Sequence, residues 1–137
     1  MSYVIDLDPR HQVLRVTTTG TVADQECREM YARLSHFAAT GGPYAAIFDM
    51  SGVTKDQLSA EAIRDLAQEA PAVPVGRLRV VVAPRLVDYG LGRMFELWRE
   101  GMGGQFQVVR SADEAYTMLG VSAEGFSRRL FPEALAA

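Results

Sequence analysis

The stretch 44–53, YAAIFDMSGV, decides the fold that this sequence predicts. Its apolar run leads to Asp49 and is followed by Ser51 and Gly52. Because Gly41-Gly42-Pro43 precedes the run, it is too short for a helix and is typical of a buried strand. We therefore predict a central strand of an α/β domain that ends in a loop. Ligands of such sheets bind beyond the carboxyl ends of the strands, so Asp49–Ser59 is the first candidate for a functional segment.

Strand and helix patterns alternate on both sides of this stretch. Before it, Tyr3–Asp8 and Gln12–Thr19 predict an antiparallel hairpin around the turn Pro9-Arg10-His11, and apolar residues at three- and four-residue spacing predict a helix from Val22 to Ala39. After it, we predict a helix over Ser59–Ala70 with Ser59 as its N-cap, a buried strand over Leu78–Ala83, a helix over Val87–Glu100, a strand over Phe106–Val109 and a helix from the capping box at Ser111 to Gly120.

This order of elements predicts the fold class. We expect an α/β domain over residues 1–120, with a mixed, mostly parallel sheet of about five strands, an N-terminal hairpin at one antiparallel edge and about four helices. Residues 121–137 form an extension in which Phe126, Leu130 and Phe131 recur at helical spacing. That spacing predicts a short C-terminal helix packed on the domain or on a partner subunit, and its apolar residues favour a homodimer.

Composition excludes several classes of function. The chain has 137 residues and a net charge of −3, and its 14 basic residues are scattered, so we expect no nucleic-acid partner. No apolar run approaches the roughly 18 residues of a membrane span, and the N-terminus lacks the pattern of a signal peptide, which predicts a cytoplasmic protein. The single cysteine excludes an intramolecular disulfide and a multi-cysteine metal site.

The sequence offers no catalytic constellation, and we predict neither an enzyme nor a cofactor. Cys27 lies on the apolar side of the first helix and is predicted to be a buried structural thiol. His11 and His36 have no second ligand at metal-binding spacing, so no metal site is expected. Asp49 and Asp56 could form an acid/base pair, but solvated or helix-capping carboxylates are the more common arrangement.

The segment Pro84–Gly92 offers a second kind of site. It leads from a strand end into a helix N-terminus, where free N–H groups can hold an anion or a polar ligand near Arg85 and Arg93. The glycines of Gly90-Leu91-Gly92 lack the third glycine and the lysine of a phosphate loop, so close helix–sheet packing is the better explanation for them.

Several motifs together resemble a known family. They are Asp49-Met-Ser-Gly-Val53, Arg79-Val-Val-Val-Ala-Pro84, Tyr89-Gly-Leu-Gly-Arg-Met-Phe95, Val108-Val-Arg-Ser-Ala-Asp-Glu-Ala115 and Leu119-Gly120. With the order of elements, they resemble STAS domains, whose prototype is the sporulation anti-anti-sigma factor. The chain is most similar to the SpoIIAA-like small bacterial proteins, which are described as STAS-like and related in shape to SEC14-type (CRAL-TRIO) lipid-binding domains. The resemblance covers about residues 3–120.

The resemblance implies two functions. The first is a non-enzymatic binding or regulatory module that holds an apolar or amphipathic, lipid-like molecule in a strand-end cleft between the second and third helices. The residues predicted to bind it are Asp49, Ser51, Arg85, Tyr89, Arg93, Met94 and Trp98. The alternative is an anti-anti-sigma-type regulator that acts by contact with a protein partner. An ungapped match places its phosphoacceptor at Leu58, which has no hydroxyl, and a shift by one residue places it at Ser59.

Overall fold

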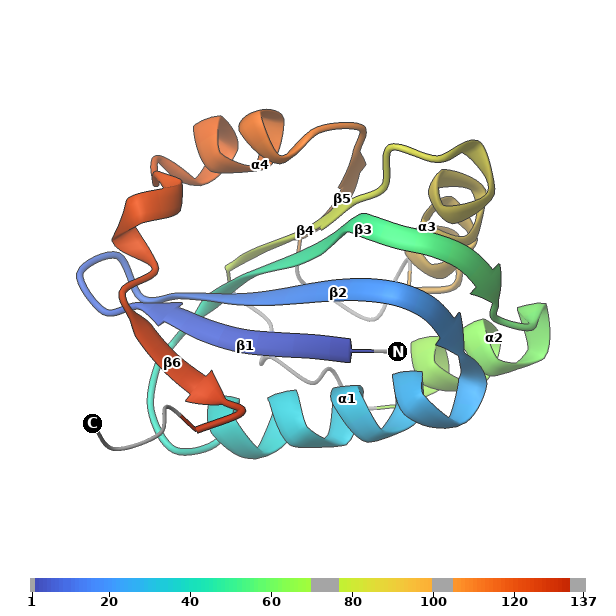
Figure 1. Cartoon of the computed structure of the whole chain (residues 1–137), viewed down its shortest axis with the longest axis horizontal. Helices are drawn as coiled ribbons and strands as arrows, with labels where there is room; N and C mark the ends of the chain where they lie inside the picture. Colours follow the sequence, from blue (N-terminus) through green and yellow to red (C-terminus); the bar gives the residue numbers. More distant parts are fainter. Residues whose placement is uncertain (1, 70–76, 100–104, 134–137) are drawn as a thin grey trace.

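The structure is a computed structural model that describes residues 2–69, 77–99 and 105–133, with the backbone alone described at Trp98 and Arg99. These residues form an α/β fold with the predicted order of the first nine elements (Figure 1). In chain order, the elements are β1 (Ser2–Asp8), β2 (Val13–Ala23), α1 (Asp24–Ala38), β3 (Ala45–Gln57), α2 (Ala60–Gln68), β4 (Leu78–Val82), α3 (Leu86–Arg99), β5 (Gln105–Val109), α4 (Ala112–Leu119), the 3-10 turn η1 (Ala123–Gly125) and β6 (Arg128–Phe131).

The sheet is mixed, and its strand order in the described residues is β5-β4-β3-β2-β1-β6. β1 and β2 form the predicted antiparallel hairpin, and the pairs β2–β3, β3–β4 and β4–β5 are parallel. β6 adds a second antiparallel pairing on the outer edge of β1. The prediction of about five mostly parallel strands with one antiparallel pairing therefore holds only for the part of the sheet up to β5.

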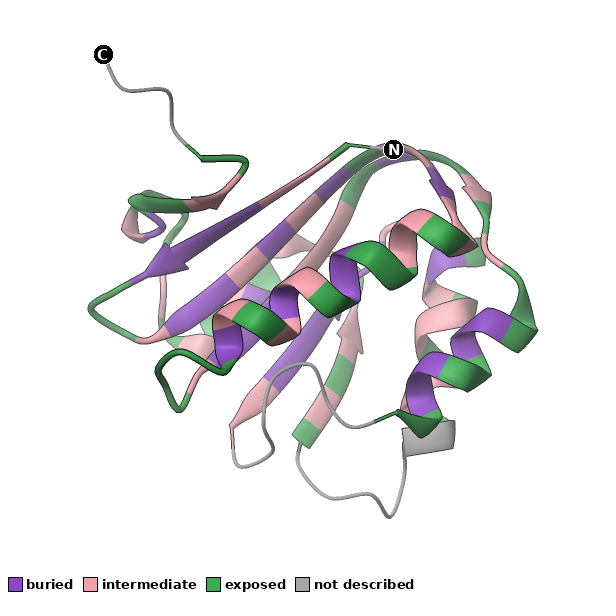
Figure 2. Cartoon of the chain, turned by 90° about the horizontal axis from the view of Figure 1, so that it is seen from below, coloured by how far each residue is buried: buried purple, intermediate pink, exposed green. Residues whose placement is uncertain are grey.

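Helices cover both faces of the sheet. From β2 to β5, each strand lies next to the preceding one on the same side, so the three connections run in one direction across the sheet. Because such connections are right-handed, α1, α2 and α3 lie on the same face. Figure 2 looks onto that face, with α1 lying across the strands. α4 lies on the opposite face, on the connection that returns from β5 to β6 (Figure 1). The core is accordingly split: Ile5, Leu14, Leu34 and Leu66 belong to the α1–α3 face, and Val13, Ile47, Val80, Ala115 and Phe126 belong to the α4 face.

β3 does not end where the sequence predicts. It continues past Val53 to Gln57 and stays paired with β2, although the register shifts twice and β3 has one extra residue at each shift. Gly52 makes this pairing possible, because a Cβ atom there would lie 2.7 Å from Thr19 Cγ2 and 3.1 Å from the Thr18 carbonyl oxygen. The predicted loop Asp49–Ser59 is therefore mostly strand. β4 pairs with β3 only as far as Asp49, so beyond that point β3 and β2 form a ribbon of two strands. The residues of this part of β3 are mostly polar, and the sequence therefore indicated a loop.

The C-terminal segment also differs from its prediction. In place of a helix, it forms η1 and then β6, which pairs with β1. Phe131 stacks on Tyr3 at 5.0 Å between ring centroids, and the Arg33 guanidinium lies 3.8 Å from the Phe131 ring. Periodicity in so short a segment does not separate helix from strand, and the free edge of β1 decided the outcome. Phe126 is buried and Leu130 packs on the core, so the chain itself covers the residues on which the homodimer prediction rested; the homodimer stays a prediction.

Candidate functional site

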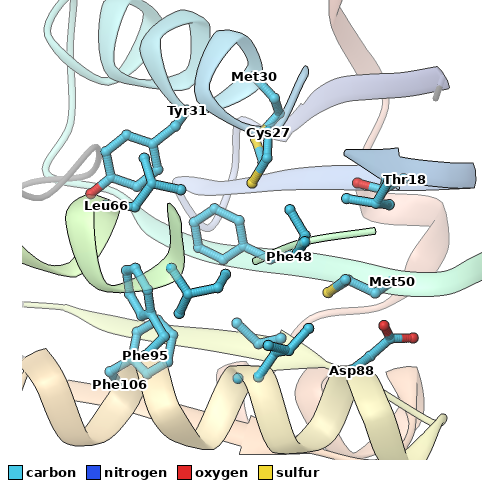
Figure 3. A pocket seen from close by; sticks show the side chains of 16 residues that line it. Thr18, Cys27, Met30, Tyr31, Phe48, Met50, Leu66, Asp88, Phe95 and Phe106 are labelled. Carbon is cyan, nitrogen blue, oxygen red and sulfur yellow. The ribbon is translucent and has the colours of Figure 1, made fainter. Parts of the chain in front are cut away.

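An apolar cavity of about 110 Å³ lies between α1, α2, α3 and the face of the sheet that they cover (Figure 3). Aromatic rings of Tyr31, Phe95 and Phe106 lie at one end, and Asp88 and Thr18 lie at the other (Figure 3). The cavity is lined by Thr18, Val22, Cys27, Met30, Tyr31, Phe48, Met50, Leu58, Ile63, Leu66, Val81, Asp88, Leu91, Gly92, Phe95 and Phe106. Every described helix of this face contributes to the wall, so the cavity belongs to the core and not to a surface loop.

Local sequence explains how the wall is built. Phe48 and Met50 alternate along β3, which turns both side chains toward the cavity. On α3, Asp88, Leu91, Gly92 and Phe95 recur at three- and four-residue spacing and therefore share one side of the helix. Gly92 allows α3 to approach β5, because a Cβ atom there would lie 3.1 and 3.2 Å from the methyl groups of Val108.

Asp88 is the unusual member of this wall. Its side chain is 0% exposed, and neither carboxylate oxygen accepts a hydrogen bond from any described residue. The nearest cation is Arg85, whose Nε lies 3.9 Å from Asp88 Oδ2, and this guanidinium also donates to the Val53 carbonyl oxygen at 3.4 Å. A buried carboxylate needs hydrogen bonds as well as a counter-charge, so this one is incompletely compensated.

Asp56, near the end of β3, is the closest acidic neighbour of Asp88. Its Oδ1 accepts from the Leu58 N–H at 2.8 Å, whereas its buried Oδ2 has no donor among the described residues. The pKa of Asp88 is raised to about 7, first by burial and then by the interaction with Asp56, and the charge of Arg85 offsets only part of this rise. Near neutral pH part of the Asp88 population is therefore protonated, and its carboxyl group can then donate a hydrogen bond.

Cys27 lies in the α1 part of the wall, as the prediction of a structural thiol requires. Burial raises the pKa of this thiol to about 11, and the negative charges of Asp24 and Asp56 act in the same direction. The thiol is therefore neutral near pH 7, and a thiol is a much weaker nucleophile than a thiolate. Within the described residues, no group of three or more histidine, cysteine or acidic side chains is arranged to hold a metal ion.

Of the residues predicted to bind a ligand, those whose side chains the structure describes are not among the wall residues of this cavity, although several of their neighbours are. On β3, Asp49 alternates with Phe48 and Met50 and accepts from the Ser51 N–H at 2.9 Å, and Ser51 is exposed. On α3, the Tyr89 ring lies 5.3 Å from the Arg110 guanidinium, Arg93 pairs with Glu96 at 2.9 Å, and Met94 is half-buried. Arg85 reaches the site only through Asp88, and the side chain of Trp98 lies outside the described residues.

Asp88 is the functional candidate that the sequence predictions missed. In the sequence, Asp56 was weighed as a partner of Asp49 beside the more common solvated or helix-capping arrangement, and the structure brings it to Asp88 of α3. A signal was present in the sequence, because Asp88 stands three and four residues before Leu91 and Gly92 and seven before Phe95. An acidic residue on the apolar stripe of a helix predicts a buried carboxylate.

Ser59 is the predicted N-cap of α2, and its hydroxyl accepts from the Ala62 N–H at 3.0 Å. The same hydroxyl donates to Asp24 Oδ2 at 2.8 Å, and the Ser59 N–H donates to Asp24 Oδ1 at 2.8 Å. Both of these bonds lower the pKa of Asp24, and the bond from the Ser59 backbone makes the larger contribution. A phosphate on Ser59 would replace the hydrogen bond to Asp24 with repulsion between like charges. Its role as phosphoacceptor stays a prediction.

No protein-family model matches the chain, and no curated protein matches it in sequence. The resemblance to STAS-like proteins therefore stays a prediction. No helix among the described residues has the length and apolar character needed to cross a membrane.

Proposed function

We propose that this protein is a non-enzymatic binding module that holds a small apolar or amphipathic molecule in the cavity between α1, α2 and α3. The observation that carries the proposal is the apolar cavity itself, about 110 Å³ in volume. Apolar cavities of comparable size stay dry and take up apolar molecules: one of about 150 Å³ binds benzene. The volume suits a single ring or the end of an alkyl chain, which matches the lipid-like ligand expected from the sequence.

The energetic cost of an empty cavity supports the same proposal. At about 24 cal/mol per Å³, a sealed empty space of this volume would destabilise the folded chain by roughly 2–3 kcal/mol, which is the upper bound for a cavity that opens to the surface. A domain of this size is stable by only about 5–15 kcal/mol, so the cavity is a large fraction of the total. A ligand that fills the space restores the lost packing contacts, and it binds the folded state alone.

Benzene is a suitable probe for this proposal. We expect the melting temperature of the wild-type chain to rise in buffer saturated with benzene, and the NMR signals of methyl groups from Leu66 and Val81 to shift. Leu91→Phe places a larger side chain in the cavity wall and should abolish both effects. Leu97→Phe is the matched control, because it makes the same change on α3 at a residue that is 58% exposed and outside the cavity wall.

Two outcomes would contradict the proposal: no response of the wild-type chain to benzene, or an unchanged response of Leu91→Phe. If Leu91→Phe does not fold, Ile63→Phe fills the same space from α2. Native mass spectrometry of protein purified from its host, followed by lipid extraction, would then identify the natural ligand. A molecule retained by the wild-type chain and lost from Leu91→Phe is the expected result.

A further inference from the structure

The polar end of the cavity lacks one positive charge. Two carboxylates, Asp56 and Asp88, meet there, and the cation that acts on Asp88 is the single guanidinium of Arg85 at 3.9 Å. The N-terminal turn of α3 contributes a partial positive charge near Asp88, which offsets only part of the second carboxylate. A proton or a bound cation is needed to balance the site.

Hydrogen bonding at this end is also incomplete. Three carboxylate oxygens, Asp56 Oδ2 and both oxygens of Asp88, are buried without a donor among the described residues. Asp88 lies in the cavity wall at the end opposite the aromatic rings (Figure 3), and Asp56, which is not a wall residue, interacts with it from β3. A proton on Asp88 supplies one donor, whereas an ammonium group supplies three together with a full positive charge.

On the basis of the proposed function, we infer that the ligand is a hydrophobic amine, whose ammonium group binds to Asp88 while its apolar body lies against Phe95, Phe106 and Tyr31. A charge-assisted hydrogen bond is about twice as strong as a neutral one, and the dry cavity strengthens it further. A neutral alcohol of the same shape would donate one hydrogen bond and leave the charge unbalanced. An anion would face two carboxylates and be rejected.

Binding of an ammonium group should depend on pH, because it displaces the proton that Asp88 carries below its pKa. The titratable and charged groups around Asp88 are Asp56 on β3, Arg85 on α3 and the neutral Cys27 thiol on α1. Asp24 and Glu26 on α1 are half-buried, and Arg79 on β4 is buried with its guanidinium 6.0 Å from the Phe106 ring, toward the aromatic end of the cavity. The other charged side chains of α1, β3 and α2 nearby are exposed to solvent, namely Arg28, Lys55, Glu61, Arg64 and Asp65. Since the pKa of Asp88 is about 7, affinity should rise up to tenfold per pH unit below pH 7 and level off above it.

Three matched probes test the inference by calorimetric or NMR titration of the full chain: benzylamine, benzyl alcohol and toluene. At pH 8 we expect benzylamine to bind at least tenfold more tightly than benzyl alcohol, and to lose about tenfold at pH 6. Asp88→Asn keeps the shape and removes the charge, so it should abolish the preference for the amine and leave the affinity for benzyl alcohol within about threefold. Asp49→Asn, on β3 but outside the cavity wall, should change neither affinity.

The outcomes separate this inference from the proposed function. If toluene and benzyl alcohol bind as tightly as benzylamine, the amine inference is wrong and the apolar binding module stands. If none of the three probes binds, both are wrong. If Asp88→Asn does not fold, Asp56→Asn removes the other carboxylate and should show the same loss of preference; an undiminished preference in that variant overturns the inference.

Discussion

The two faces of the sheet each contain an aspartate–arginine pair, and the two pairs are built differently. On the α4 face, Arg15 donates to Asp6 through Nε at 3.0 Å and Nη2 at 2.7 Å, and through Nη1 to the Tyr116 hydroxyl at 2.8 Å. The Phe126 ring lies 4.3 Å from the same guanidinium. On the α1–α3 face, Arg85 approaches Asp88 only to 3.9 Å, and Asp88 accepts no hydrogen bond from the described residues.

This difference separates a structural ion pair from a binding site. Bidentate geometry satisfies both oxygens of Asp6, so its charge is compensated by the fold. The fold does not compensate the charge of Asp88 in the same way. The cavity beside Asp88 has room for a group that would compensate it. A buried carboxylate therefore points to a ligand only when its hydrogen bonds and its counter-charge are incomplete.

Removal of the arginine on the α4 face should give the largest effect. Arg15→Ala leaves the Asp6 carboxylate buried without its partner and also removes the contacts to Tyr116 and Phe126. We expect a loss of about 3–5 kcal/mol in the free energy of unfolding, measured with urea. Arg93→Ala removes an exposed pair with Glu96 and should cost less than about 1 kcal/mol. Equal losses in the two variants would show that the Arg15 network contributes no more to the free energy of unfolding than an exposed ion pair does.

Asp8 on the hairpin turn provides a second test of a fully partnered carboxylate. Burial would raise the pKa of Asp8, but hydrogen bonds from His11 and from the Arg10 N–H outweigh it and lower the pKa. Asp8→Ala should cost about 2–3 kcal/mol at pH 7. Since the folded-state pKa is depressed, this contribution is present above pH 4 and lost as the pH falls further. A cost that persists unchanged at pH 2.5 would contradict the account, and Asp113→Ala, at an exposed residue of α4, is the control.

Asp88 should show the opposite dependence and a smaller effect. Its folded-state pKa is raised from 3.8 to about 7, so the folded chain binds more protons than the unfolded chain between pH 4 and pH 7. Its contribution to stability is therefore present below pH 4 and lost as the pH rises to 7, at up to about 1.4 kcal/mol per pH unit. Asp88→Asn should flatten this slope and gain about 1–2 kcal/mol at pH 8. A variant less stable than wild type at pH 8 would mean that the ionised carboxylate has a partner in the fold.

Much of the fold could be predicted from local patterns, and the site could be predicted only in part. The sequence placed a cleft between the second and third helices, and the cavity does lie against α2 and α3. Two of the predicted contacts, Asp49 and Met94, are sequence neighbours of the wall residues Phe48, Met50 and Phe95, because which side of a strand or helix faces the cavity depends on packing. Asp88 was missed because its burial depends on how α3 rests against β3 and β5.

The sequence by itself determined the type and order of the first nine elements. Hydrophobic periodicity and caps are local properties: Ser59 and Ser111 cap α2 and α4 as predicted, and Gly120 ends α4 with a φ of 66°. The tertiary structure alone decided that β3 continues through Gly52, that the C-terminal segment joins β1 as a strand, and that Asp56 meets Asp88. Each of these depends on contacts between residues far apart in the chain, and such contacts leave no periodic pattern in the sequence.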